Sequence, residues 1–427
     1  MENKQNLAEE QNNPTNNNLS SRRKFLQTLG VSAAALGLQQ ISCSSPKQVV
    51  SRPNAMDQVN LSDIPGFEKT EVDPTVSDGW VPVSDKKVKV GLIGHGICKF
   101  AVLFGFQDHP NVEVVAVSDL YPDRCAEMAK IARCNKTYPS LEELVKDPEI
   151  EAVYIATDAP SHAKHAILAL EHGKHVACAV PAVWGSLEDA DRLYEAWKKS
   201  GKKYMLFETS AYHEGVYIMR ELYKRDYFGR LVYSEGEYYH YFGTPLGGHN
   251  NWRQGLVPQW YPTHANAYYN CVTGQSFTEV SCLGMPSILD QFQPKNNVYK
   301  NPFGTEIALY RTSEGGMSRM AVSWDTAGFG AEAGRIRGEK GSFYGKYQGL
   351  RKDVPTIKKP PLPPGVSPGG HGGSHGYLTN EFITAILQDR HPLVNIAVGL
   401  NLTVPGIVAH QSALKGGEWL KIPQYKI

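Results

Sequence analysis

The sequence predicts an α/β protein in which a domain with a parallel sheet precedes an α+β domain with a large, predominantly antiparallel sheet. Within residues 87–210, apolar runs of strand length alternate with helical patterns, as in a sheet whose strands are joined by crossover helices. Within residues 211–427, candidate strands follow one another with few long helices between them, which indicates antiparallel pairing.

The elements of the first domain can be predicted individually. Its predicted strands are Val88–Ile93, Val112–Val117, Ala152–Ala156, His175–Ala179 and Tyr204–Phe207. The helical patterns between them are Ile97–Phe106, Ala163–Glu171 and Leu187–Lys199. Gly173 and Gly201 follow the last two patterns, where a glycine commonly ends a helix.

The second domain is richer in tyrosine, glycine and histidine. Its predicted strands are Leu231–Tyr239, Thr278–Leu283, Phe303–Tyr310, Met317–Trp324 and Arg335–Gly338. Its predicted helices include Glu214–Lys224 and Ala265–Thr273. One face of such a sheet is expected to be packed, and the other is expected to face the cofactor.

Composition and charge exclude some classes of function. The chain has 427 residues, with 44 Lys and Arg against 43 Asp and Glu, which gives a formal net charge of +1. This balance does not supply the cationic surface that binds phosphate backbones, so no nucleic-acid partner is expected. The seven cysteines contain no CxxC pair and no zinc-like spacing, so we expect neither a disulfide framework nor a metal site.

The N-terminal segment has the features of an export signal. Arg22 and Arg23 precede Phe25, Leu26 and an apolar run at 28–38 that is too short to span a bilayer. Adjacent arginines in this setting predict the twin-arginine route and a periplasmic location. The alternatives are the basic region of an ordinary secretory peptide and a short amphipathic anchor.

Cys43 marks the end of this predicted leader, which covers residues 1–43. It is a candidate site for a lipid anchor, and plain cleavage nearby is the alternative. Residues 44–86 are rich in Ser, Pro and Val, and we interpret them as a linker and an irregular arm before the first domain.

A glycine-rich turn follows the first predicted strand. Gly94 permits a tight turn, Gly96 lets the backbone approach a pyrophosphate, and the following helix start offers free N–H groups. Asp119 ends the next strand, where a carboxylate meets the ribose hydroxyls of NAD and repels the extra phosphate of NADP. The pattern therefore predicts a Rossmann domain that binds NAD, with an ordinary βαβ turn as the alternative. Lys99 departs from the pattern, which expects Gly or Ala there.

The segment IATDAPSHAKHAILALEHGKHVACAVP, at 155–181, resembles the Gfo/Idh/MocA oxidoreductases, and the resemblance extends over about 87–427. It implies closing helices and a final strand in the C-terminal tail, and commonly a homodimer. Those enzymes carry Glu-Lys-Pro where this chain has Ala179-Val180-Pro181. The lysine touches the reacting hydroxyl in the family's dehydrogenases, and Val180 cannot move a proton.

The string NWRQGLVPQWYPTH, at 251–264, resembles the branch that contains NAD-dependent glycosidases of family 109, typified by bacterial α-N-acetylgalactosaminidase. These resemblances and the glycine turn predict a cofactor site at Gly94, Gly96, Ile97, Asp119, Thr157, Ala159, Ser161, His162, Ala179, Val180 and Thr209. They predict a substrate site at Tyr238, Arg253, Tyr261, His264 and His375. The tyrosine that such glycosidases carry has no counterpart at 328–333, which offers only Phe329.

His264 is the predicted proton-transfer residue, supported by Tyr261. Imidazole is the side chain best matched to proton transfer near neutral pH, and a helix N-terminus would lower its pKa and favour a neutral base. Isolated histidines and tyrosines more often pack in the interior, and Arg253 could form a surface ion pair. His371 and His375 could share a metal ion, but no third ligand is near them in the sequence, so a loop over a sugar or a helix start is favoured.

Three functions remain open on the sequence. The first is an exported NAD-dependent oxidoreductase that transfers a hydride at a ring carbon of a carbohydrate or glycoside. The second is an NAD-dependent glycoside hydrolase that oxidises C3 transiently and eliminates the leaving group. The third is a non-catalytic sugar-binding protein on the same fold, because one scaffold can host unrelated functions.

Overall fold

The computed structural model describes residues 73–243 and 247–427, which belong to one compact unit. The predicted leader at 1–43, with Arg22, Arg23 and Cys43, lies outside the described residues, as does most of the predicted linker. No helix within the described ranges combines the length and the apolar character needed to cross a membrane.

The first domain contains a six-stranded parallel sheet in the order β3-β2-β1-β4-β5-β6. Its strands are β1 Val88–Ile93, β2 Val112–Ser118, β3 Thr137–Tyr138, β4 Ala152–Ile155, β5 His175–Cys178 and β6 Tyr204–Leu206. Its helices are α2 Phe100–Leu103, η3 Phe106–Asp108, α3 Pro122–Ala132, α4 Leu141–Leu144, η4 Ala159–Ser161, α5 His162–Glu171 and α6 Leu187–Ser200. All of β4 is buried, as expected for a strand covered by helices on both faces. This is the predicted Rossmann architecture.

The helix expected at Ile97–Phe106 is wrong in its extent. Lys99 and Gly105 have left-handed backbone angles, with φ of 48° and 73°. A right-handed helix cannot run through such residues, so only a four-residue α2 forms, followed by the separate turn η3. The N-terminal turn is consequently more irregular than the pattern of apolar residues suggests.

The second domain contains an eight-stranded sheet in the order β13-β12-β11-β7-β10-β9-β8-β14. Its strands are β7 Leu231–Tyr239, β8 Phe277–Pro286, β9 Phe303–Thr312, β10 Met317–Ser323, β11 Ala331–Gly338, β12 Gly341–Tyr344, β13 Lys346–Gly349 and β14 Leu420–Lys421. Strands β7 and β10 pair in parallel, and the other described pairs are antiparallel, which confirms the predicted sheet. The short strands β12 and β13 were not predicted, because they lack a regular apolar alternation.

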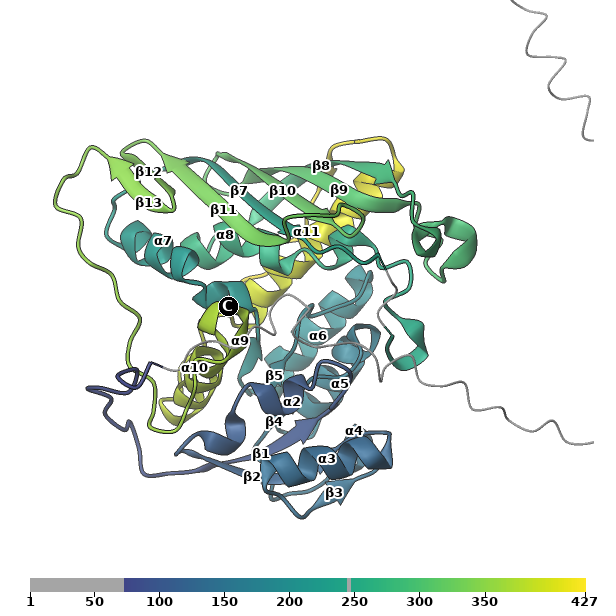
Figure 1. Cartoon of the computed structure of the whole chain (residues 1–427), viewed down its shortest axis with the longest axis vertical. Helices are drawn as coiled ribbons and strands as arrows, with labels where there is room; N and C mark the ends of the chain where they lie inside the picture. Colours follow the sequence, from purple (N-terminus) through teal and green to yellow (C-terminus); the bar gives the residue numbers. More distant parts are fainter. Residues whose placement is uncertain (1–72, 244–246) are drawn as a thin grey trace, which may run out of the picture. The chain divides into compact units, whose positions relative to one another are not determined.

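Helices cover one face of this sheet and lie between it and the first domain (Figure 1). The helical elements of this half are η5 Thr209–Tyr212, α7 Glu214–Lys224, η6 His249–Asn251, η7 Pro258–Trp260, α8 Thr263–Thr273, η8 Asp290–Phe292, η9 Pro294–Asn296, α9 Gly370–Gly373, α10 His375–Leu387 and α11 Ile396–Leu414. Helix α8 packs closely on β7, because a Cβ at Gly236 would lie 2.1 Å from the carbonyl oxygen of Ala265. That contact fixes the start of α8, where His264 stands.

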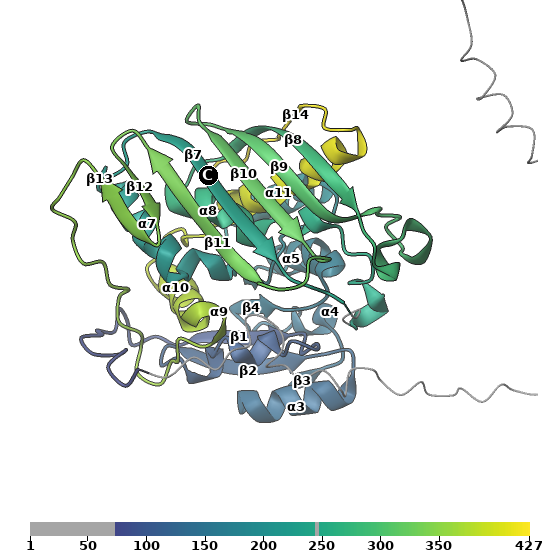
Figure 2. The ribbon, with the colours of Figure 1, turned by 45° about the horizontal axis from the view of Figure 1, so that its top comes forward.

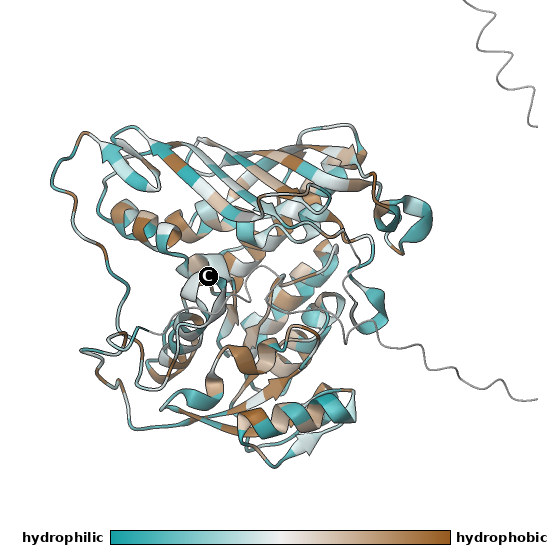
Figure 3. Cartoon of the chain, viewed as in Figure 1, coloured by the Kyte–Doolittle hydropathy of each residue, from teal (hydrophilic) through white to brown (hydrophobic). Residues whose placement is uncertain are grey.

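Among the residues that the structure describes, no helix lies on the opposite face of the large sheet (Figure 2). Hydrophilic and hydrophobic residues are mixed along its strands (Figure 3). Leu283 and Met285 on β8 and Ile307 and Leu309 on β9 are exposed. Leu283 pairs with Ile307 across the two strands, so apolar side chains of both strands share this face.

Candidate active site

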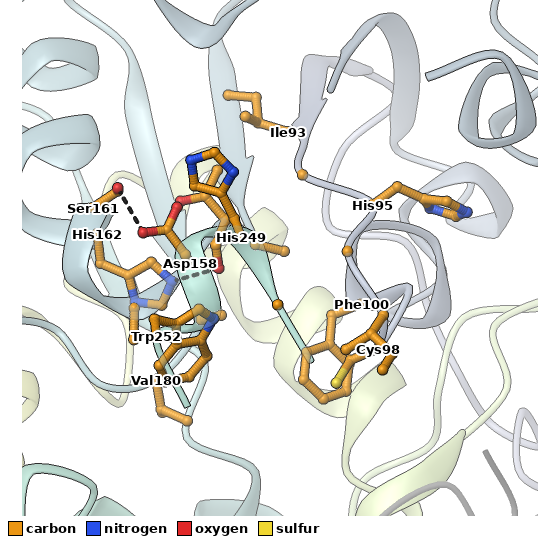
Figure 4. A pocket seen from close by; sticks show the side chains of 18 of the residues that line it. Ile93, His95, Cys98, Phe100, Asp158, Ser161, His162, Val180, His249 and Trp252 are labelled. Atoms are coloured by element: carbon orange, nitrogen blue, oxygen red, sulfur yellow. Dashed lines mark hydrogen bonds between the residues drawn. The ribbon is translucent and has the colours of Figure 1, made fainter. Parts of the chain in front are cut away.

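One cavity of about 360 Å³ lies where the two domains meet, at the carboxyl ends of the parallel strands. Every predicted cofactor residue lines it, and so do Tyr238, Arg253, Tyr261 and His264 from the second domain. Figure 4 shows Asp158, Ser161 and His162 on one side of this pocket and Cys98 and Phe100 on the other. The fold therefore brings together residues that are far apart in the sequence.

The turn after β1 has the backbone geometry that a dinucleotide needs. Gly94 has a φ of +87°, and a Cβ there would lie 2.6 Å from the carbonyl oxygen of Ala156, so only glycine fits. Gly96 is also left-handed, and a Cβ built there meets nothing within 4 Å. Lys99 reaches sideways to Glu127, with 2.5 Å between its Nζ and Oε1, so its long side chain does not prevent the turn.

Asp119 is oriented at the rim of the pocket by two backbone donors. Its Oδ2 accepts a hydrogen bond from the His95 N–H at 2.6 Å, and its Oδ1 accepts one from the Tyr121 N–H at 2.8 Å. The side chain of His95 points away from the pocket (Figure 4) and lies 3.4 Å from Glu127. Burial lowers the pKa of His95, which therefore supports the turn as a neutral side chain.

His162 ties two of the lining loops together. Its Nδ1 lies 2.8 Å from the carbonyl oxygen of Pro181, and its Nε2 lies 3.2 Å from that of Thr157. Both partners can only accept, so the closer contact fixes the Nδ1–H tautomer. The side chain thus holds the Val180 segment in place. Val180 lines the pocket with an apolar side chain where the resembling dehydrogenases have lysine.

The second domain contributes a cluster of aromatic rings around His264. The rings of Tyr238 and Tyr261 have centroids 4.7 Å and 5.7 Å from that of His264. Arg253 lies over the ring of Trp252, 4.1 Å from its centroid, and its Nη1 donates to the carbonyl oxygen of Gly247 at 3.2 Å. Aromatic faces beside a fixed guanidinium suit a polar, ring-shaped ligand such as a sugar.

His264 differs from its expected charge state. Its Nδ1 lies 2.8 Å from Oε1 of Glu208 and 3.8 Å from Oε2 of Glu332. Burial alone would lower its pKa, but the two carboxylates outweigh burial and raise the pKa to about 9. The prediction of a neutral base is therefore wrong. The two carboxylates raise the pKa of His264 by more than the helix N-terminus could lower it, and His264 is an imidazolium at neutral pH.

Glu208 and Glu332 were missed by the sequence analysis. Burial would raise the pKa of each carboxyl, but the attraction of His264 outweighs it and both pKa values are lowered. Glu208 stands two residues after the end of β6, and its position near a strand end could have identified it. Glu332 pairs with Tyr238 only through the register of β11 on β7, for which the sequence carried no local pattern.

The two tyrosines of the cluster are hydrogen-bond donors rather than bases. Burial raises the pKa of Tyr238 and of Tyr261. The hydroxyl of Tyr238 lies 3.1 Å from Nδ1 of His240, and burial lowers the pKa of His240 to about 4. A phenol and a neutral imidazole therefore lie side by side in the lining.

His375 lies behind the pocket rather than in its lining, which corrects its predicted substrate contact. Its ring stacks on Phe104 with centroids 4.1 Å apart, and its Nε2 lies 2.8 Å from Nδ1 of His371. His371 is the residue that lines the cavity. Within the described ranges, no three His, Cys, Asp or Glu side chains are grouped to hold a metal ion.

Comparison with known families bears on the first domain. Residues 88–208 match the Gfo/Idh/MocA model, described as an oxidoreductase family with an NAD-binding Rossmann fold. The first domain is similar to the NAD-binding Rossmann domain of the Gfo/Idh/MocA oxidoreductases. This confirms the predicted resemblance and the predicted NAD cofactor, and the Gly94 turn and Asp119 fit that nucleotide.

Relatives and solved structures agree with this assignment. Glycosyl hydrolase family 109 protein 1 of Bacteroides fragilis is 32% identical over 176 residues, 39% of this chain, and the match spans 38% of that relative's length. A family 109 protein of Streptomyces niveus is 23% identical over 463 residues, covering 95% of this chain and 91% of its own. The fold also resembles levoglucosan dehydrogenase in complex with NADH and levoglucosan, with a TM-score of 0.63, 19% identity, and 79% of this chain and 100% of that chain covered.

Proposed function

We propose that the protein is an NAD-dependent oxidoreductase that acts on a carbohydrate or glycoside by hydride transfer at a ring carbon. One observation carries this proposal: a single cavity joins the Gly94 turn to the cluster around His264. A nucleotide on that turn and a sugar against the aromatic rings would share the cavity. The structural likeness to a dehydrogenase that binds levoglucosan with NADH supports the substrate class.

Some lining residues of the cavity would hold the cofactor, and others would donate hydrogen bonds or transfer protons. Gly94, Gly96 and Asp119 would hold the nucleotide, with Thr209 nearer its nicotinamide end. Bound NAD supplies a hydride acceptor. His264, charged and anchored on Glu208, would donate a hydrogen bond to a substrate oxygen, and this donor is preorganised because its partner is fully buried.

A redox-assisted glycoside hydrolase is the second candidate, and the charge of His264 favours it. Cleavage of a glycosidic bond needs an acid that protonates the departing oxygen, and an imidazolium in the lining can serve. The name of the curated relatives points the same way. In this scheme the sugar is oxidised transiently at C3, the leaving group at C1 is eliminated, and water and the hydride are returned.

One experiment separates these functions. Purified protein is incubated with free sugars and with aryl glycosides, with and without added NAD, while reduced cofactor and released phenol are both followed. Net reduction of NAD by free sugars supports the oxidoreductase, and phenol release without net reduction supports the hydrolase. Sugar binding by calorimetry without either product would refute both and leave a non-catalytic binding protein.

We also propose export to the periplasm by the twin-arginine route, with Cys43 as the lipid-anchor site. The paired arginines before Phe25 and Leu26 support the route, and folded export would carry NAD that was loaded in the cytoplasm. Replacing Arg22 and Arg23 with lysine should leave precursor inside the cell, and normal export of that variant would refute the route. Cys43→Ala should release the processed protein from the membrane fraction.

A homodimer through the helix-free face of the large sheet completes the proposal. Leu283, Ile307 and Leu309 expose apolar side chains on adjacent strands of that face, which supports burial against a second copy. Leu309→Asp should lower the mass measured by sedimentation from dimer to monomer. A wild-type protein that sediments as a monomer at micromolar concentration would refute it.

A further inference from the structure

The proposed reaction needs a proton acceptor, and neither the position of the family's lysine nor the ring of His264 supplies one. Oxidation of a sugar hydroxyl releases a proton from its oxygen, and the lysine that receives it in the resembling dehydrogenases is replaced by Val180. His264 is already protonated by its pairing with Glu208 and Glu332. Tyr238 and Tyr261 are phenols whose pKa is raised by burial, so neither accepts a proton readily.

We propose that His371 is the proton-accepting residue of this cavity and that His375 is its positioning residue. His371 lines the cavity together with His264, Tyr238 and Tyr261. It comes from the glycine-rich segment before α10, far along the chain from the other three. This inference rests on the oxidoreductase function proposed above and names the group that completes it.

Hydrogen bonding fixes which nitrogen of His371 is basic. The Nδ1 of His375 lies 3.2 Å from the carbonyl oxygen of Leu103, which can only accept, so this nitrogen carries the hydrogen. In neutral His375 the other nitrogen, Nε2, then has the lone pair, and it faces Nδ1 of His371 at 2.8 Å. Nδ1 of His371 is therefore the donor, and its Nε2 is the basic atom.

His240 is the other neutral imidazole of the second domain beside the cluster, and its tautomer is not fixed in this way. Its Nδ1 faces the hydroxyl of Tyr238, which can donate or accept. For His371, the contact of His375 with the carbonyl of Leu103 leaves only one tautomer, since a carbonyl has no hydrogen to give. The same arrangement, an imidazole oriented by a second group, is the general form of an activated base.

The backbone around His371 is held in an unusual conformation. His371 has a φ of 50°, although it is not a glycine, and Gly369, Gly372 and Gly373 beside it have φ values of 74°, 63° and 70°. Left-handed angles at a non-glycine residue are costly and cluster at functional sites. Here they present the imidazole to the cavity, with its centroid 5.6 Å from the ring of Phe100, which Figure 4 shows in the pocket.

The charges around His371 are compatible with a neutral acceptor. The groups that act on it are His375, Glu332, His264 and His213. Burial is the largest influence and lowers its pKa, and three neighbouring imidazoles act in the same direction, while Glu332 opposes them. Glu332 would stabilise the imidazolium of His371 once a proton arrives, whereas the charged His264 opposes it.

The proposed step balances as an alcohol oxidation. The O–H and C–H bonds of one carbinol carbon break, a carbonyl forms, the proton passes to Nε2 of His371, and the hydride goes to oxidised NAD, which the proposed function supplies. His375 takes up no substrate proton. It keeps Nδ1 of His371 engaged and holds the ring in position.

The test uses the full-length protein with two replacements at 371 and one at 375. His371→Gln and His371→Gly should lower turnover by about a hundredfold or more, the usual effect of losing an acid–base group. Added imidazole should restore part of the activity of His371→Gly, since that replacement also relieves the left-handed backbone. Affinity for NAD should stay within about twofold of wild type, because the nucleotide residues are untouched. His172→Ala, at an exposed histidine of the first domain, is the matched control.

A second measurement does not depend on turnover. With ¹⁵N-labelled histidine, the resonance lost in His371→Gln should come from a neutral ring protonated at Nδ1. His375→Phe keeps a ring stacked on Phe104 but removes the acceptor, so the tautomer of His371 should become mixed and kcat should fall more than KM rises.

The outcomes separate the two proposals. Wild-type protein that turns over no sugar refutes the proposed function, whereas the resonance of His371 still reports its tautomer. Turnover of His371→Gln within a few-fold of wild type, or a resonance protonated at Nε2, overturns the role of His371 and leaves the function standing. Equal losses in kcat and NAD affinity would also overturn it.

Discussion

Two buried histidine–glutamate pairs in this protein have nearly the same geometry. His264 Nδ1 lies 2.8 Å from Glu208, and His410 Nδ1 lies 2.7 Å from Glu306, with both carboxylates fully inaccessible to solvent. The pairs differ in what surrounds them. His264 lines the cavity and has Glu332 as a second carboxylate, whereas His410 packs against the ring of Trp260 away from the lining.

The His264 pair serves the reaction, whereas the His410 pair has a bracing role: it holds a neighbouring segment in place. The second oxygen of Glu306 accepts a hydrogen bond from the N–H of Gln259 at 2.9 Å, two residues before Tyr261, so this pair secures the segment that leads into the site. The His264 pair instead places a charged donor in the cavity. The same histidine–glutamate contact therefore serves two purposes, and whether the ring lines the cavity decides between them.

The largest expected difference concerns turnover. His264→Gln should lower kcat by roughly a hundred- to ten-thousand-fold, because it removes the charged donor from the cavity. His410→Gln should lower kcat only a few-fold, since its side chain does not reach the lining. Steady-state kinetics with NAD affinity measured in parallel would check this. Similar losses in the two variants would remove the distinction between the pairs.

Replacing the glutamates tests the same comparison from the other side. Glu208→Gln should lower kcat by about a hundredfold, because His264 loses the partner that keeps it charged. Glu306→Gln should mainly lower the free energy of unfolding, by about 1–3 kcal/mol, since it disturbs a buried hydrogen-bonded group. Urea titration and kinetics on both variants provide the measurements. A stable Glu306→Gln protein with hundredfold lower kcat would contradict the bracing role.

The charge on His264 also predicts how stability depends on pH. Its pKa is raised from 6.5 to about 9 on folding, so its contribution is complete below about pH 6.5 and is lost as pH rises through about 9. The free energy of unfolding should therefore fall across this interval, by on the order of a few kcal/mol at most. His264→Gln should show a smaller fall, whereas His172→Gln, at an exposed site, should keep it. An unchanged slope in His264→Gln would mean that the imidazole is neutral.

Much of the first domain could be predicted because its patterns are local. Strand, glycine turn, helix and terminal acid stand close together in the chain, so Gly94 and Asp119 follow from sequence alone. The strand Leu231–Tyr239 and the helix Glu214–Lys224 of the second domain were also predicted to the residue. The spacing of apolar residues predicts such a strand or helix wherever one of its faces is buried.

The electrostatics of the site could not be predicted in the same way. The charge of His264 depends on Glu208 and Glu332, which come from different sheets, and on burial that only the packed fold provides. His375 and His371 are four residues apart, yet the backbone angles of the intervening glycines decide which of them faces the cavity. From the sequence, only the dipole of its own helix could be considered for the pKa of His264. The two carboxylates that raise this pKa lie far along the chain from it.

The smallest expected effects distinguish two tyrosines that stand beside the two pairs. Tyr261 lines the cavity near His264, whereas Tyr310 is fully buried and its hydroxyl donates to Oε1 of Gln259 at 3.4 Å. Tyr261→Phe should lower kcat about tenfold, which corresponds to one lost hydrogen bond of about 1.4 kcal/mol, with stability nearly unchanged. Tyr310→Phe should leave kcat within about twofold and lower the free energy of unfolding by about 1 kcal/mol or less, because its hydrogen bond is long. Kinetics and urea titration of both variants give the result, and a larger kcat loss in Tyr310→Phe would show that positioning of the Gln259 segment, rather than contact with substrate, limits turnover.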